Sequence, residues 1–325
     1  MLILIVFQVC YERDTMSRFR REKNSINRLA MLTHGWNALF LVVLLLGTLT
    51  VIIPVLLVVI VSFSSERSIA DRGFSFMPAE WTAKAYEYIF RTGDQIVQSY
   101  LVTIFYTVSG TLLSISVMTM FAYVIAQRQF RLRKGLTWYL FFTMLFSGGL
   151  VPSYILNVRY LGLKNTVWIF ILFNTVSAYY VIILRTFIRT TIPESLVESA
   201  RIDGAGHFTT FLKIVLPLLK AGVATVGLFN VVTRWNDWFV GMLYIEHPKL
   251  VPLQTMLIRL QATIDFLKQN TAVAGTPDGI ALLAILPDQS MRMATTIIVI
   301  LPILFAYPFF QRYFVQGLTL GSIKE

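Results

Sequence analysis

The stretch 198–217 combines an acidic side chain, small neighbours and a glycine turn at a fixed spacing. It reads ESARIDGAGHFTTFLKIVLP. A carboxylate such as that of Glu198 can accept two parallel hydrogen bonds from an arginine, and small residues beside it let another surface come close. The chemistry expected here is therefore recognition rather than bond-making. The residues that carry the pattern are Glu198, Ser199, Ala200, Asp203, Gly204, Ala205, Ile214, Leu216 and Pro217.

The same stretch predicts a short helix, a sharp turn and a second helix. Pro193 suits the first turn of a helix, where its missing N–H is not needed. Glu198 is spaced to pair with Arg201 on one helix face. The run Gly204-Ala205-Gly206 breaks this helix, and a second helix from about Phe208 leads into an apolar segment. This geometry can transmit a movement of a docked protein to a membrane helix. The alternative is an amphipathic surface helix with a solvated Glu198.

A second group of polar and aromatic residues interrupts an apolar segment downstream. Ionisable residues in a membrane span usually face a cavity or each other, and Arg234 and Asp237 are spaced to pair. Aromatic faces, amides and carboxylates also suit a path for a sugar, whereas an interfacial aromatic belt with a structural ion pair is an equal alternative. The candidate path residues are Asn230, Arg234, Trp235, Asn236, Asp237 and Trp238, with Asn174, Tyr179 and Tyr180 as secondary candidates.

Catalytic and cofactor-binding patterns are absent from the sequence. It contains no G-x-x-x-x-G-K-[ST] loop to hold a phosphate, and no nucleophile–base arrangement stands out. The three histidines are scattered and Cys10 is the only cysteine, so neither a metal site nor an intrachain disulfide is expected. We therefore expect no catalytic, cofactor-binding or metal-binding residue on this chain.

The composition is that of a membrane protein. Of the 325 residues, 56% are hydrophobic and 14% are charged, and the mean hydropathy is +0.68; soluble domains are closer to a quarter charged. The net charge of +11 does not indicate nucleic acid binding, because basic residues in short loops set the orientation of membrane proteins.

Several segments are long and apolar enough to cross a bilayer as helices of about 20 residues. Because only helices satisfy all backbone groups in lipid without forming a closed barrel, the predicted fold is all-α and polytopic. Pro54 and Pro302 are expected to kink their spans. The six predicted transmembrane helices cover residues 37–63, 100–126, 136–156, 168–185, 221–243 and 294–310.

Lysine and arginine are denser on the side that holds both termini and the 198–217 loop, which places these parts in the cytoplasm. The predicted organisation is a cytoplasmic tail (1–35) and a transmembrane domain (36–325) with its core at 97–316. A cytoplasmic loop (190–219) lies between spans four and five. The apolar start 1–10 is too short to span and lacks a basic flank, so Met16 is a plausible true start. External segments are expected to contain short helices at 83–90 and 253–266.

The 198–217 pattern resembles the coupling loop of ABC importer permeases. In that family it reads E-A-A, three residues, G, nine residues, I-x-L-P; only Ser199 departs, and it is another small residue. The resemblance implies that the chain is a non-catalytic membrane subunit. ATP and Mg²⁺ would then be bound by separate ATPase subunits.

Two further stretches resemble carbohydrate permeases of the maltose-type class. One is 152–166, with Pro152, Tyr154, the Leu161-Gly162-Leu163 run, Asn165 and Thr166. The other is the end of the chain, 302–324, where Glu325 follows Lys324 in place of the usual glycine. Within the class, the chain is most similar to the branch for complex and oligomeric sugars, including pectin fragments. The resemblance extends from Tyr100 to Lys324.

The resemblance implies an assembly in the bacterial cytoplasmic membrane. Its expected members are a second homologous permease, two ABC ATPases and an extracellular sugar-binding protein, with lipid around them and no nucleic acid. Gly317, Gly321 and Lys324 are expected to form a compact tail against the ATPases. A secondary transporter driven by an ion gradient is the alternative function, and a membrane enzyme is a more distant one.

Overall fold

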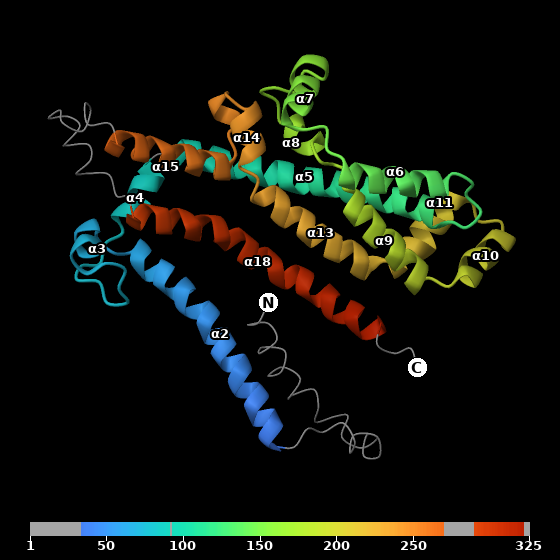
Figure 1. Cartoon of the computed structure of the whole chain (residues 1–325), viewed down its shortest axis with the longest axis horizontal. Helices are drawn as coiled ribbons and strands as arrows, with labels where there is room; N and C mark the ends of the chain where they lie inside the picture. Colours follow the sequence, from blue (N-terminus) through green and yellow to red (C-terminus); the bar gives the residue numbers. More distant parts are fainter. Residues whose placement is uncertain (1–33, 92, 270–288, 322–325) are drawn as a thin grey trace. The chain divides into compact units, whose positions relative to one another are not determined.

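The computed structural model describes residues 34–91, 93–269 and 289–321, and these residues form helices (Figure 1). Within these ranges the only β-type pairing is an isolated bridge between Ser64 and Trp81. The all-α prediction is therefore confirmed. The contacts divide the chain into two compact units, one of residues 1–86 and 287–297 and the other of residues 87–286 and 298–325.

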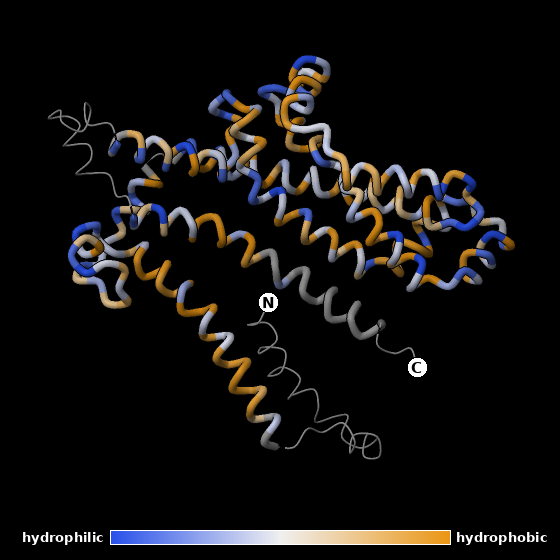
Figure 2. Tube along the Cα trace, in the orientation of Figure 1, coloured by the Kyte–Doolittle hydropathy of each residue, from blue (hydrophilic) through white to orange (hydrophobic). Residues whose placement is uncertain are grey.

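The first unit is dominated by α2 (His34–Ser62), whose backbone trace is coloured as hydrophobic over most of its length in Figure 2. Its most apolar stretch buries no side chain within the chain, as expected for a helix that faces lipid. The short α3 (Glu66–Arg72) follows. The Glu66 carboxylate accepts hydrogen bonds from the amide (2.8 Å) and hydroxyl (2.7 Å) of Ser290, and so caps the first turn of α18 (Gln289–Gly321).

The second unit is built around the long helix α5, against which α6, α8, α9, α13 and α15 pack. Its N-terminal neighbour α4 (Lys84–Arg91) and helix α15 confirm the two short helices predicted for the external segments. The elements of this unit in chain order are α5 (Gly93–Ala126), α6 (Arg133–Leu145), α7 (Leu150–Ile155), η1 (Leu156–Tyr160), α8 (Trp168–Leu172), α9 (Ala178–Thr191), α10 (Glu194–Ile202), α11 (His207–Thr210), η2 (Phe211–Val215), α12 (Leu216–Leu218), α13 (Lys220–Trp235), α14 (Phe239–Tyr244), η3 (Pro248–Leu250) and α15 (Leu253–Gln269).

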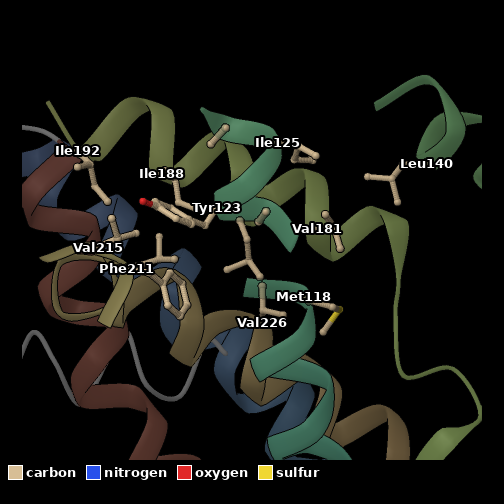
Figure 3. Close-up of a cluster of buried hydrophobic side chains, with 14 residues drawn as sticks. Met118, Tyr123, Ile125, Leu140, Val181, Ile188, Ile192, Phe211, Val215 and Val226 are labelled. Atoms are coloured by element: carbon tan, nitrogen blue, oxygen red, sulfur yellow. The ribbon is translucent and has the colours of Figure 1, made fainter. Parts of the chain in front are cut away.

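A hydrophobic core joins these elements at one end of α5. Figure 3 shows Met118, Tyr123 and Ile125 of α5 packed with residues of α9 and α13 and with Phe211 and Val215 of η2. Full burial of such side chains contributes about 1.5–3 kcal/mol each. The η2 segment, which follows the turn at 203–205, is therefore packed firmly against α5, α9 and α13.

Three of the predicted spans are not single helices, and the continuous form expected for them is wrong. The helix predicted over 136–156 ends at Leu145 and resumes at Leu150 with a bend of 111°. Gly149 in this bend has φ +84°, a conformation that glycine adopts without strain. The helices predicted over 168–185 and 221–243 are interrupted at 173–177 and 236–238. By length and composition, two described helices can cross a membrane alone, or up to four if each bent pair counts as one span.

The 152–166 stretch makes a loop contact through Asn165. Asn165, with φ +56°, accepts hydrogen bonds from the amides of Glu246 (2.6 Å) and His247 (3.1 Å). The ammonium of Lys164 lies 2.7 Å from the Glu246 carboxylate, and this hydrogen bond raises the pKa of Lys164 and lowers the pKa of Glu246. These residues hold two loops together. The predicted start at Met16 and the apolar 1–10 segment lie outside the described residues.

Candidate functional site

The turn after α10 is a helix stop built by the backbone. The amide of Ala205 donates to the carbonyl of Ala200 (2.9 Å), and the amide of Gly204 donates to that of Arg201 (3.0 Å). With Gly204 at φ +82°, this is a Schellman motif, in which a left-handed residue satisfies the last carbonyls of the helix. The Asp203-Gly204-Ala205 run therefore ends α10 at a defined residue and sets the direction of the chain beyond it.

One face of α10 is fixed to the rest of the second unit. Ala200 is buried and Val197 packs against the hydrophobic core. The guanidinium of Arg201 donates to the side-chain oxygens of Gln129 (2.6 Å) and Gln127 (3.0 Å), which follow the end of α5.

The ion pair expected between Glu198 and Arg201 is therefore wrong. Two amide oxygens from another element take up the planar guanidinium instead. A second link joins the same elements, since Arg128 lies 2.5 Å from Glu194 at the start of α10.

The opposite face of α10 is exposed. Glu198, Ser199 and the large apolar side chain of Ile202 (86% exposed) lie on it, and Phe208 (65% exposed) follows in α11, beyond the turn. Contiguous exposed apolar side chains rimmed by polar ones mark surfaces for protein partners. Ile202 and Phe208 are absent from the sequence prediction, although a large apolar residue on each side of a glycine turn in a polar loop is a usable signal.

The nine pattern residues fall into two groups in the structure. Glu198, Ser199, Asp203, Gly204 and Pro217 are exposed, whereas Ala200 is buried and Ala205, Ile214 and Leu216 are partly buried. The first group presents a surface and the second group anchors it. We call the exposed face formed by Glu198, Ser199, Ile202, Asp203 and Phe208 the α10 surface.

The continuation from α11 into α13 is less straight than the sequence predicts. It passes through the π-helical turn η2, and the chain then bends by 79° at Leu219, between α12 and α13. Pro217 has no N–H to donate to the preceding turn, which favours such a local rearrangement. Leu219 is fully buried at the bend, so the angle is held by packing.

Arg234 is the centre of the second candidate site, and it is 7% exposed. Its guanidinium donates to Asn230 Oδ1 (2.9 Å), to Ser114 Oγ (2.8 Å) and to the carbonyl of Phe170. The Phe170 carbonyl belongs to the last turn of α8, the negative end of the helix dipole, which favours a cation. Arg234 thus joins α5, α8 and α13.

The ion pair expected between Arg234 and Asp237 is wrong. Asp237 instead accepts a hydrogen bond from the amide of Val240 (3.1 Å) and caps the start of α14, where a carboxylate is favoured. Each side chain forms hydrogen bonds at a helix end rather than with the other side chain. Sequence spacing makes such a pair possible, but the break at 236–238 turns Asp237 toward α14.

The remaining path candidates lie in different surroundings. Trp235 is buried, and its indole N–H donates to the carbonyl of Val299 (3.0 Å), so it anchors α13 within the second unit. Asn236 is exposed and accepts a hydrogen bond from Gln254 (3.2 Å), and Trp238 is 43% exposed. The structure therefore brings Asn230 and Arg234 together and leaves Asn236 and Trp238 at the surface.

A small cavity lies between the helix breaks. It measures about 50 Å³ and is lined by Asn174, Asn230, Thr233, Arg234 and Asp237, among others. A water molecule takes up about 30 Å³ of liquid. The cavity in this conformation therefore has room for water and not for a sugar ring.

The end of the chain differs from the expected compact tail. Helix α18 includes Gly317 and ends at Gly321, so the predicted turn at Gly317 is wrong. A glycine inside a helix costs up to about 1 kcal/mol relative to alanine but does not prevent the helix. Lys324 lies outside the described residues.

Comparison with known proteins gives close matches to sugar transport permeases, whereas no family model matches the chain. The polygalacturonan/rhamnogalacturonan transport system permease protein YtcP of Bacillus subtilis is 35% identical over 86% of this chain and 95% of that protein. The melibiose/raffinose/stachyose import permease protein MelC of the same species is 33% identical over 70% and 75%. The crystal structure of a bacterial ABC transporter involved in import of the acidic polysaccharide alginate matches with a TM-score of 0.72 and 28% identity, over 87% of this chain and 99% of that one. The helical fold, the 198–217 pattern and these similarities show that the chain belongs to the permease subunits of sugar ABC importers.

Proposed function

We propose that this permease carries an oligosaccharide across the bacterial cytoplasmic membrane in an assembly powered by separate ATPase subunits. The assembly consists of this chain, a second homologous permease, two ABC ATPases that bind ATP and Mg²⁺, and an extracellular sugar-binding protein. The similarity to YtcP and MelC supports an oligosaccharide, with pectin fragments as the first substrates to test. It also leaves the ion-gradient-driven alternative without support.

The proposed topology has six spans with both termini and α10 in the cytoplasm. Three of the spans are formed by helix pairs: α6 with α7, α8 with α9, and α13 with α14. Irregular backbone at membrane depth is tolerated where it is covered by protein or lines a cavity. The breaks at 173–177 and 236–238 and their polar side chains fit that role, and we assign the sugar path to Asn236, Asp237 and Trp238 in an open conformation.

The α10 surface carries the proposed coupling to the ATPase. The observation that supports this assignment is the division of α10 into an anchored face and an exposed face. An ATPase arginine would bind the Glu198 carboxylate, and Ile202 and Phe208 would enter an apolar groove. Movement of α10 would reach α13 through Phe211 and reach α5 through Arg201.

Co-purification tests the assignment of the α10 surface. The tagged wild-type chain is expected to retain an ATPase and a second permease after extraction in mild detergent. Ile202→Asp is expected to lose the ATPase and keep the second permease, because a carboxylate replaces an apolar side chain that is 86% exposed. Met77→Asp, at another exposed position (80%), is the control and should retain both. Retention of the ATPase by Ile202→Asp would contradict the assignment.

Substitutions at Gly204 separate backbone conformation from size. No described atom lies within 4 Å of a Cβ added at Gly204, so the cost comes from φ +82° alone. A left-handed conformation costs a β-branched residue about 1–2 kcal/mol or more, and asparagine tolerates it. We expect Gly204→Val to lose most sugar uptake at equal membrane abundance and Gly204→Asn to keep most of it. Gly206→Ala, at ordinary φ and in open space, is the control; equal uptake by all three variants would rule out this role of the turn.

The end of the chain is proposed to contact the ATPases, as it does in the class that it resembles. Deletion of residues 318–325 removes the last turn of α18 and everything after it. We expect weaker retention of the ATPase or slower ATP hydrolysis in the purified complex, with normal insertion. Deletion of Glu325 alone is the control. If both assembly and hydrolysis are unchanged in the longer deletion, the tail has no such contact.

A further inference from the structure

A basic pocket lies where the start of α6 meets the end of α9, two helices that pack against each other. Its volume is about 470 Å³. None of its residues belongs to the Arg234 network, and one of them, Arg189, also lines a neighbouring cavity beside Glu194 and Glu198. The lining residues are Arg133, Lys134, Thr137, Trp138, Phe141, Arg185 and Arg189.

The positive charge of this pocket is not balanced within the described part of the chain. There, none of its four cationic side chains has a carboxylate within 4.0 Å, since the ion pairs formed are Arg128–Glu194 and Lys164–Glu246. Arg133, Arg185 and Arg189 line the same pocket, so their like charges lie near one another. The four charges therefore repel one another, and no carboxylate of the described residues forms an ion pair with any of them.

Two backbone and side-chain features add to this imbalance. The Nε of Arg185 is buried and has no hydrogen-bond partner among the described residues, which is costly for a charged group. Arg133 and Lys134 occupy the first turn of α6, where the helix dipole is positive and disfavours cations. That turn has neither an acidic residue nor a side-chain cap. A bound anion would relieve all of these costs together.

The side chains beside the cations are apolar and exposed, which favours an amphipathic anion over a small inorganic one. Trp138 (75% exposed), Phe142 (57%) and Leu145 (79%) continue from the basic end along α6. Tryptophan is enriched at the headgroup level of membranes, and basic pockets between membrane helices bind anionic lipid headgroups. We propose that this pocket binds the phosphodiester headgroup of an anionic phospholipid, whose acyl chains lie along the exposed apolar face of α6.

Lipid retention by the assembled importer tests this proposal. The purified complex is equilibrated with phosphatidylglycerol or phosphatidylcholine in detergent, and bound lipid is counted by native mass spectrometry. Wild type is expected to retain phosphatidylglycerol selectively. Arg185→Gln combined with Arg189→Gln should bind it about 25-fold more weakly, since each basic residue near a membrane surface contributes about fivefold. Arg131→Gln, an exposed cation outside the pocket, is the matched control and should bind as wild type does.

The other outcomes also decide the question. Should the double variant fail to assemble, Arg189→Gln alone is expected to weaken binding about fivefold, and unchanged binding overturns the proposal. Equal retention of the two lipids by wild type overturns the proposal. The absence of bound lipid also overturns it, and would mean that the second permease covers α6. Displacement of the lipid by millimolar inorganic phosphate would identify a site for a free anion instead. Weaker lipid retention by Trp138→Ala supports the lipid.

Discussion

Replacing Glu198 by arginine is expected to abolish sugar uptake while the chain still inserts into the membrane. Glu198 is exposed, and its carboxylate forms no hydrogen bond or ion pair with any other residue that the structure describes. The substitution therefore removes no side-chain contact within the described chain, and we expect it to weaken the contact with the ATPase. Breaking a hydrogen-bonded charge pair at an interface costs about 2–5 kcal/mol, and reversing the charge adds repulsion. We expect coupling to fall by at least about 30-fold, measured as sugar-stimulated ATP hydrolysis in proteoliposomes.

Glu194 provides the matched control on the same helix. It is also an exposed carboxylate, but it pairs within the chain with Arg128. Exposed ion pairs of this kind contribute about 0–1 kcal/mol, so Glu194→Gln should leave uptake nearly unchanged. Glu198→Gln keeps an acceptor oxygen without the charge and is expected to fall between wild type and Glu198→Arg. Full sugar-stimulated hydrolysis by Glu198→Arg would remove the main support for the α10 surface as the ATPase contact.

Replacing Arg234 by glutamine is expected to lower the free energy of unfolding by about 3–5 kcal/mol, the cost of breaking a buried charge network. The substitution leaves Ser114, Asn230 and the Phe170 carbonyl without their charged donor. Arg234→Lys should rescue little, because an ammonium cannot donate in the same planar fork. Thermal unfolding of the purified complex and the abundance of inserted protein measure the effect.

Substitutions at Asp237 test whether its carboxylate pairs directly with Arg234 or has a separate partner. Asp237→Asn should be mild, since the amide oxygen can still accept from the Val240 amide and cap α14. The double variant Arg234→Gln with Asp237→Asn should be no more stable than Arg234→Gln alone, because the two charges have different partners. Restored stability in the double variant would mean that the charges pair after all.

Gly110 gives an independent check of the same network. A Cβ at Gly110 would lie 2.6 Å from Nη1 of Arg234, and the guanidinium cannot retreat without losing its hydrogen bonds. Gly110→Ala should therefore destabilise the protein by about 1–3 kcal/mol. Gly135→Ala, where no described atom lies within 4 Å, is the control and should be neutral or stabilising. Equal stability of the two variants would show that Arg234 is loosely held.

The sequence by itself determined the features that depend on neighbouring residues. The helix stop at Gly204 uses hydrogen bonds between residues no more than five positions apart, so the Asp203-Gly204-Ala205 pattern predicts it directly. The helical class follows equally from apolar composition, because a bilayer allows few other solutions. The fixed spacing between Glu198 and Pro217 likewise indicates the family of the chain.

Only the tertiary structure decided the partners of the charged side chains and the form of the spans. Arg201 binds Gln127, 74 positions away, and Arg234 binds Ser114, 120 positions away, whereas sequence spacing suggested carboxylates three residues distant. An ion pair between residues three positions apart is possible in any helix. It does not form here because tertiary packing brings other acceptors closer to the guanidinium and in better geometry. The breaks at 146–149, 173–177 and 236–238 were hidden for a related reason: apolar composition measures whether a segment can enter lipid, not whether its backbone stays helical throughout.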